Sequence, residues 1–282
     1  MENATRMSYD NTAAAQLYHE WHPYGLHHVV VDHTNFHYFG DLTGKSIVEF
    51  GCGSGTFLKQ CSAKGASYCL GFDVNEAMIS AGTKAHSDKM AAHHVNGTTD
   101  HSRFVVHDCF KPIEENYGQF DLAIAQFLLH ECASESDLQV FVKNALRLLK
   151  PGGKLFIGQC PYVANTFKDQ EVIAYLCGYL HPSCDDAAGK DPFFARVPAF
   201  YPAPTSFSQT RRPFTRKPMF TFTDNYWSKE KVMTNLEEGG FVQVQLLPQL
   251  FPDYVAPSEV KQIKALEEPI ILIGAEKPCT RN

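Results

Sequence analysis

The fold of this chain is decided by the stretch Val48-Glu49-Phe50-Gly51-Cys52-Gly53-Ser54-Gly55-Thr56-Phe57, which places three glycines at alternate positions. A β-prone run, Ser46–Phe50, leads into the glycines, and a helix-like segment, Thr56–Lys64, follows them. The pattern predicts a strand, a tight turn that a ligand can approach closely, and then the N-terminus of a helix. Because the first N–H groups of a helix have no partner within it, this turn is expected to bind a ligand.

The residues around the glycine turn restrict the class of that ligand. A dinucleotide-binding fingerprint needs glycine or alanine at the position of Thr56, so a nicotinamide cofactor is disfavoured. Glu49 stands two residues before the first glycine. A carboxylate there suits a ligand that carries a cationic amine better than it suits a pyrophosphate.

Acids follow the next two strand-like runs. Ser67–Phe72 is followed by Asp73, about twenty residues past the turn, where a carboxylate can accept both ribose hydroxyls of an adenosine. Arg103–His107 is followed by Asp108. These positions predict that both side chains lie at the carboxyl ends of parallel strands, where open α/β sheets bind ligands.

The remaining elements complete an α/β pattern. Their predicted order is strand Phe120–Gln126, helix Ser136–Leu149, a stop at Lys150-Pro151-Gly152-Gly153, strand Lys154–Gln159, helix Ser228–Glu238, and strands Phe241–Leu247 and Pro269–Ala275. Alternating strands and helices predict a doubly wound, Rossmann-like α/β sheet with right-handed crossovers. The sheet is expected to be mostly parallel, with an antiparallel pair of strands at the end.

The E-x-G-x-G-x-G spacing and the L-R-L-L-K-P-G-G-K-L phrase at 146–155, together with the two acids, resemble the class I S-adenosylmethionine-dependent methyltransferases. The resemblance covers Ile47–Gln159 and, less closely, Trp227–Lys277. It implies S-adenosylmethionine as the cofactor, and it implies that Asp108 accepts the adenine amino group. The cofactor-binding residues that it implies are Tyr9, Tyr18, Glu49, Gly51, Cys52, Gly53, Gly55, Asp73, Val74, Asp108, Cys109 and Gln126. Helix packing is an equal alternative for the two tyrosines.

Methyl transfer from an activated sulfonium needs an acceptor held in line at about 3 Å and shielded from water, and it needs a base only if the acceptor arrives protonated. His130, shortly after the fourth predicted strand and beside Glu131, is the candidate base. The alternative is that His130 packs or caps the turn.

Four segments are expected within one methyltransferase domain, 1–282. They are a helical lid at 1–44 (helices Asp10–Trp21 and Leu26–Phe39), the cofactor-binding core at 45–159, an insertion after the fifth strand at 160–226, and a C-terminal part at 227–282. The insertion is rich in proline and aromatic residues and is predicted to cover the acceptor. Its aromatic residues could instead form a satellite core. Its basic residues Arg211, Arg212, Arg216 and Lys217 could bind an anionic acceptor or lie on a solvated face.

Histidine and cysteine offer no metal site in this sequence. Six histidines lie between His19 and His37, but no acid or cysteine completes a set of three or four ligands, so we expect none. A lid lined with histidines that titrate near neutral pH is the alternative. The nine cysteines form no C-x-x-C pair, which favours free thiols in a reducing compartment.

Composition restricts the partners of the protein. A net charge of −6 over 282 residues disfavours a nucleic-acid-coating role. No apolar run reaches the roughly 20 residues of a membrane span, and the N-terminus has no signal-peptide core. We therefore expect a cytoplasmic enzyme that methylates a small molecule, with its oligomeric state left open. The alternatives are a protein or RNA methyltransferase and a non-catalytic cofactor-binding protein, and the intact glycine turn and both acids disfavour the latter.

Overall fold

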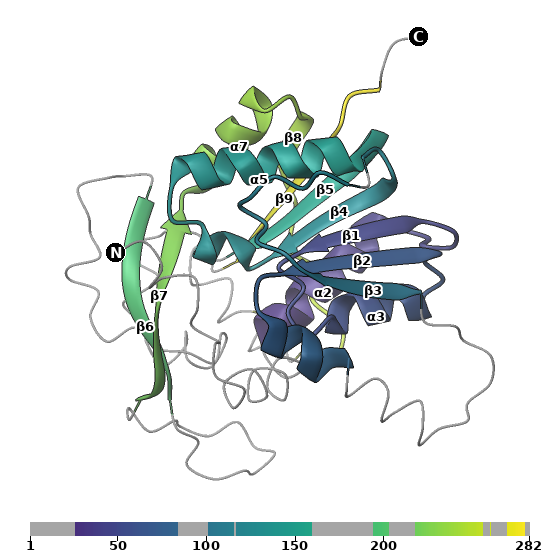
Figure 1. Cartoon of the computed structure of the whole chain (residues 1–282). Helices are drawn as coiled ribbons and strands as arrows, with labels where there is room; N and C mark the ends of the chain where they lie inside the picture. The colour runs from purple at the N-terminus through teal and green to yellow at the C-terminus, as the bar shows by residue number, and fades with distance from the viewer. Residues whose placement is uncertain are drawn as a thin grey trace.

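The computed structural model describes residues 26–83, 101–115, 117–159, 194–202, 218–255, 260 and 270–279. Seven strands form the central sheet in the order β3-β2-β1-β4-β5-β9-β8, as Figure 1 shows. Their bounds are β1 Ser46–Phe50, β2 Tyr68–Asp73, β3 Ser102–Val106, β4 Phe120–Gln126, β5 Leu149–Gln159, β8 Val242–Leu246 and β9 Ile271–Glu276. No helix in these ranges is long and apolar enough to cross a membrane.

The chain adds its strands in opposite directions on the two sides of β1. Parallel pairing joins β1 to β2 and to β4, and the chain moves outward in one direction through β3 and in the other through β5. Glu49 is paired with Gly71 of β2 and Ile124 of β4. In sheets of this kind, ligands bind outside the carboxyl ends of the strands at this switch point. Because β9 is antiparallel to both β5 and β8, the doubly wound fold with a final antiparallel pair is confirmed.

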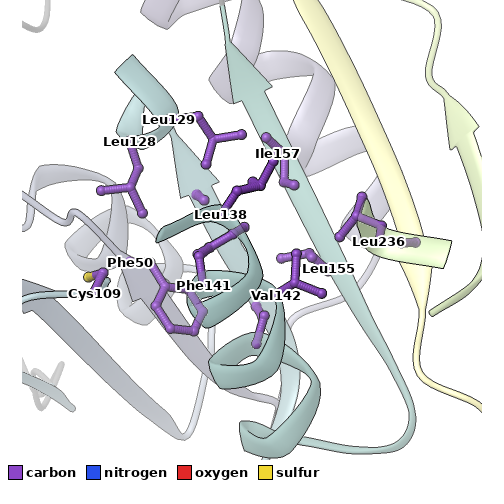
Figure 2. Close-up of a cluster of buried hydrophobic side chains, with 14 of the residues drawn as sticks. Phe50, Cys109, Leu128, Leu129, Leu138, Phe141, Val142, Leu155, Ile157 and Leu236 are labelled. Atoms are coloured by element: carbon purple, nitrogen blue, oxygen red, sulfur yellow. The ribbon is translucent and has the colours of Figure 1, made fainter. Parts of the chain in front are cut away.

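Helices cover both faces of the sheet. Helices α2 (Leu26–Phe39) and α3 (Thr56–Ala63) lie on one face, and α5 (Glu135–Leu148) and α7 (Lys229–Glu238) lie on the other. On the second face, apolar side chains of α5 point toward those of the strands, as Figure 2 shows. Alternate residues of each strand point to opposite faces of the sheet. Because helices cover both faces, both are apolar, and the strand sequences are nearly continuous hydrophobic runs.

Most predicted elements form where the sequence pattern places them. Helix α2 has the predicted bounds, and Ser228 caps α7 by accepting a hydrogen bond from the Lys231 N–H at 3.1 Å. Strand β5 begins at Leu149, five residues before the predicted start. The predicted stop is part of the strand because Gly152 donates its N–H to Lys277 O at 3.0 Å and Lys277 donates to Gly153 O at 2.9 Å.

The insertion contains regular structure that the sequence analysis did not predict. Strands β6 (Phe194–Pro202) and β7 (Pro218–Trp227) pair antiparallel as a ribbon beside the central sheet (Figure 1). The aromatic residues of the ribbon favour strands, but the prolines at its ends disfavour them, and for this reason the sequence pattern did not predict the ribbon. Tyr226 is buried. The side chains of the other aromatic residues predicted to cover the acceptor, and the basic cluster at 211–217, lie outside the described residues.

The end of β7 is fastened to the sheet. Asn225 Nδ2 donates to His130 O at 2.9 Å, and the Trp227 indole N–H donates to Cys132 O at 2.9 Å. Gln159 Nε2, at the end of β5, donates to Trp227 O at 3.4 Å. The last residue of β5 and the last residue of β7 are therefore in direct contact.

Candidate functional site

A pocket lies at the carboxyl ends of β1 and β4, at the switch point. It holds about 340 Å³ of empty space, including the part open to solvent. Its lining residues are His28, Glu49, Gly51, Cys52, Gly53, Ser54, Thr56, Phe57 and Gln126. Five of the predicted cofactor-binding residues, Glu49, Gly51, Cys52, Gly53 and Gln126, are thus brought together in one wall.

The glycine turn needs its glycines for two different reasons. Gly53, at a φ of 54°, donates its N–H to Asp73 Oδ2 at the end of β2, at 2.7 Å. Gly55, at a φ of 72°, stands at the start of α3, and a Cβ there would lie 2.2 Å from the Phe104 ring. Gly53 therefore shapes the pocket, whereas Gly55, also predicted to bind cofactor, lets β3 pack against the turn.

Asp73 is held in place by backbone donors. Its Oδ2 accepts the Gly53 N–H, and its Oδ1 accepts the Asn75 N–H at 2.8 Å. Burial raises the pKa of this carboxyl, and the hydrogen bonds from Asn75 and Gly53 oppose the rise. Each carboxylate oxygen has a second lone pair, so the oriented carboxylate keeps its capacity to accept ligand hydroxyls.

Glu49 is an acid without a charged partner in the described structure. Its side chain is 3% exposed, and Oε2 has no hydrogen-bond partner among the described residues. Burial raises the pKa of this carboxyl well above its usual range, and the nearby Asp32 and Asp73 carboxyls raise it further. A buried acceptor aimed into a pocket indicates that the pocket's ligand supplies the missing donor.

The loop after β3 carries two more of the predicted cofactor-binding residues, Asp108 and Cys109, and neither of them lines the pocket. Asp108 Oδ1 accepts the Phe110 N–H at 3.0 Å, while Cys109 is buried beside Phe72. Val74, just after β2, is 47% exposed, which leaves an apolar surface beside Asp73. Asn144 of α5 holds this loop from behind: its Nδ2 donates to Cys109 O at 3.0 Å and to Lys111 O at 2.8 Å.

Comparison with known proteins identifies the family. Residues 48–157 match the family model described as "Methyltransferase domain". Residues 48–157 are therefore similar to methyltransferase domains, and the fold is that of the structure of a methyltransferase with bound S-adenosylhomocysteine described below. This finding confirms the predicted family, fold class and cofactor.

Two curated relatives and one solved structure show how far the likeness extends. An mRNA cap guanine-N(7) methyltransferase of Caenorhabditis elegans is 34% identical over 41% of this chain and 31% of its own length. A ubiquinone biosynthesis O-methyltransferase of Coxiella burnetii is 30% identical over 41% of this chain and 43% of its own length. This chain thus spans less than half the length of either relative. The structure of magnesium protoporphyrin IX methyltransferase from Synechocystis, with bound S-adenosylhomocysteine (SAH), aligns at a TM-score of 0.55 and 12% identity over 96% of this chain and 97% of that one.

The pocket and the neighbouring Asp73 carboxylate offer groups whose chemistry suits the family's cofactor. An adenosine needs hydroxyl acceptors, which the anchored Asp73 carboxylate offers, and an ammonium group needs an anionic acceptor, which Glu49 offers. No group of three histidine, cysteine or acid side chains suited to a metal ion occurs within the described residues. Tyr9 and Tyr18, the remaining predicted cofactor contacts, lie outside them.

His130 of the methyltransferase domain does not line the pocket. It belongs to the short 3₁₀ helix η2 (Leu128–Glu131) and is 7% exposed, and its ring centroid lies 5.1 Å from that of Tyr226, with the two rings tilted by 50°. Its other ring neighbour, Phe127, also contacts His28 in the pocket wall. His130 thus lies one ring away from the pocket, and its role as a base stays a prediction.

The sequence analysis missed several pocket residues of the methyltransferase domain. His28, Ser54, Thr56 and Phe57 also line the pocket, and the Asp32 carboxyl is near enough to raise the pKa of Glu49. His28 and Asp32 are four residues apart on α2, and this spacing places them on the same face of a helix. The sequence shows this spacing. It does not show which side of the helix faces β1, so it could not predict that His28 and Asp32 lie at the site.

The Asn144 contacts lead to a testable prediction. Asn144 is 2% exposed, and its Oδ1 also accepts the Ile113 N–H at 3.1 Å, so Asn144→Leu would leave three buried backbone groups without partners. We expect a loss of about 3 kcal/mol in the free energy of unfolding, measured by urea titration. SAH affinity should fall as well, because the loop that carries Asp108 loses its anchor. A loss below about 1 kcal/mol would contradict this role for Asn144.

Proposed function

We propose that this protein transfers a methyl group from S-adenosylmethionine to a small-molecule acceptor. The observation that carries the proposal is the presence of two acids at the glycine turn: Asp73 accepts the Gly53 N–H, and Glu49, whose Oε2 has no hydrogen-bond partner among the described residues, lines the pocket. The two acids match the two ends of the cofactor, since one accepts hydroxyls and the other accepts a cation.

Each part of the site then has a defined task. Asp73 accepts the ribose hydroxyls, Val74 and Asp108 contact the adenine, and Glu49 and the turn at Gly51–Gly53 hold the methionine end. The bound cofactor supplies an activated methyl group on a sulfonium. Gln126, at the end of β4 and in the pocket wall, is placed to orient the methionine end or the acceptor. His130 takes a proton only if the acceptor arrives protonated and η2 brings its ring to the pocket.

The net charge of −6 supports a small, uncharged or cationic acceptor, and cysteines that form no C-x-x-C pair support a cytoplasmic setting. The likeness to a ubiquinone biosynthesis O-methyltransferase agrees with such an acceptor. The likeness to an mRNA cap methyltransferase favours RNA as the second candidate. An acceptor screen that includes capped RNA beside phenolic, amine and thiol small molecules separates the two, because only one class should yield methylated product.

Ligand-dependent thermal stability tests the cofactor assignment. SAH is expected to raise the melting temperature, since a ligand at 100 times its Kd that binds only the folded state stabilises it by about 2.7 kcal/mol. S-Adenosylmethionine should act similarly, whereas NAD should leave the melting temperature unchanged because Thr56 occupies the position of its third glycine. A larger shift with NAD than with either adenosyl ligand would exclude the proposal.

A further inference from the structure

The short helix η2 contacts the sheet, the end of the insertion and the glycine turn. Its start is fixed by the sheet, because the Phe127 N–H donates to Gly158 O of β5 at 2.7 Å. Phe127 has a φ of 55°, and a left-handed conformation is costly for a large side chain. Such a conformation persists only where the surrounding contacts impose it, so the fold determines where η2 begins.

The end of η2 is held by β7, the last strand of the insertion. Asn225 Nδ2 donates to His130 O, and the Trp227 indole N–H donates to Cys132 O, each at 2.9 Å. Both donor side chains are buried, Asn225 at 1% and Trp227 at 5% exposure. Removal of either donor therefore loses a buried hydrogen bond that positions η2.

Leu128, the first residue of η2, packs directly on the glycine turn. A Cβ at Gly51 would lie 2.9 Å from Leu128 Cδ1 and 3.3 Å from Leu128 Cβ, so this approach requires glycine. Leu128 is buried in the core cluster that Figure 2 shows. Gly51 itself lines the pocket. Because packed interiors transmit displacements, a shift of η2 is expected to move this part of the pocket wall.

We propose that Asn225 and Trp227 are positioning residues for the methionine end of the cofactor. They act through η2, whose Leu128 fixes the position of Gly51. This inference rests on the proposed function, which places the methionine end at Gly51–Gly53. The last strand of the insertion then contributes to cofactor affinity, in addition to any role of the insertion toward the acceptor.

Trp227→Phe tests the proposal because it keeps an aromatic ring and removes the indole N–H. We expect SAH to bind about tenfold more weakly, since the end of η2 loses a buried hydrogen bond. 5′-Methylthioadenosine, which lacks the amino-acid group, should bind within about twofold of its wild-type affinity. Isothermal titration measures both ligands. An equal loss for the two ligands would contradict a role at the methionine end.

A double-mutant cycle tests the route through Leu128. If Trp227 acts through Leu128, then Trp227→Phe combined with Leu128→Ala should bind SAH about as weakly as Leu128→Ala alone. Strict additivity of the two effects would overturn this route. Asn225→Leu removes the donor to His130 O at similar side-chain size and should weaken SAH binding in the same direction. It takes the place of Trp227→Phe in the cycle if that variant does not fold.

Leu236→Ala separates positioning from a general loss of stability. Leu236 is 0% exposed and belongs to the same core cluster, but it lies on α7, apart from Leu128 in Figure 2. Urea titration should show a loss of stability at least as large as that of Trp227→Phe. SAH affinity should nevertheless stay within about twofold of the wild type. An equal weakening in Leu236→Ala would show that affinity follows stability alone and would overturn the positioning role.

The outcomes separate the two proposals. Failure of SAH to bind the wild-type protein overturns the proposed function and, with it, this inference. SAH affinities within about twofold of the wild type in both Trp227→Phe and Asn225→Leu overturn the positioning role and leave the proposed function intact.

Discussion

Replacing Asp73 with alanine is expected to weaken SAH binding at least 100-fold, or by about 3 kcal/mol. Two losses combine in this variant. The ribose loses its charged acceptor, and the glycine turn loses the carboxylate that accepts the Gly53 N–H at 2.7 Å. The N–H of Asn75, which donates to the other oxygen, is released as well. Isothermal titration with SAH measures the change in affinity.

The Asp73 result has two controls. Asp73→Asn keeps one oxygen for a backbone N–H but turns an amide N–H toward the other, so its affinity should lie between those of the wild type and the alanine variant. Asp253→Ala removes an exposed acid far from the turn in sequence and should leave SAH affinity unchanged. An affinity within threefold of the wild type in Asp73→Ala would show that this acid does not hold the cofactor.

Replacing Gly55 with valine is expected to reduce the free energy of unfolding by 3 kcal/mol or more, on the order of the strain and crowding involved. A left-handed conformation, at a φ of 72°, is costly for a β-branched residue, and its Cβ would lie 2.2 Å from the Phe104 ring. Gly53→Ala should instead weaken SAH binding while changing stability less, because Gly53 lines the pocket. Urea unfolding and SAH titration of both variants separate the two effects.

A second substitution separates the two sources of destabilisation at Gly55. Phe104→Ala combined with Gly55→Val removes the ring that the valine would strike, so the double variant should be more stable than the sum of the single effects predicts. The backbone strain should remain in the double variant. Strict additivity would show that the Phe104 contact is not the reason for glycine at this position.

The parts of the site that were predictable are those set by local sequence. Glu49, Gly53 and Asp73 lie at or next to strand ends, and strands are readable as short apolar runs bounded by glycine or acid. Parallel strands bring their carboxyl ends to one edge, so a list of strand ends already predicts which of these residues meet.

The parts that were not predictable depend on how layers pack. Asp32 and His28 join the site only because α2 lies over β1 with that side inward, which the helical spacing alone does not determine. His130 follows β4 closely in sequence, yet Phe127, at a φ of 55°, turns the chain so that His130 packs against Tyr226. The β6–β7 ribbon depends on pairing between distant segments, and sequence patterns describe such pairing poorly.

The hydrogen bond from Gln159 to Trp227 has a consequence for how proteins of this kind diverge. The residues on either side of the segment 160–226, Gln159 of β5 and Trp227 of β7, are in contact, and doubling the length of a loop between two such ends adds only about 0.6 kcal/mol to its closure. We therefore expect lineages to lengthen, shorten or exchange this segment while the cofactor half of the protein stays unchanged. An enzyme can then acquire a new acceptor by replacement of this one segment. The replacement must end in a strand that carries the equivalents of Asn225 and Trp227.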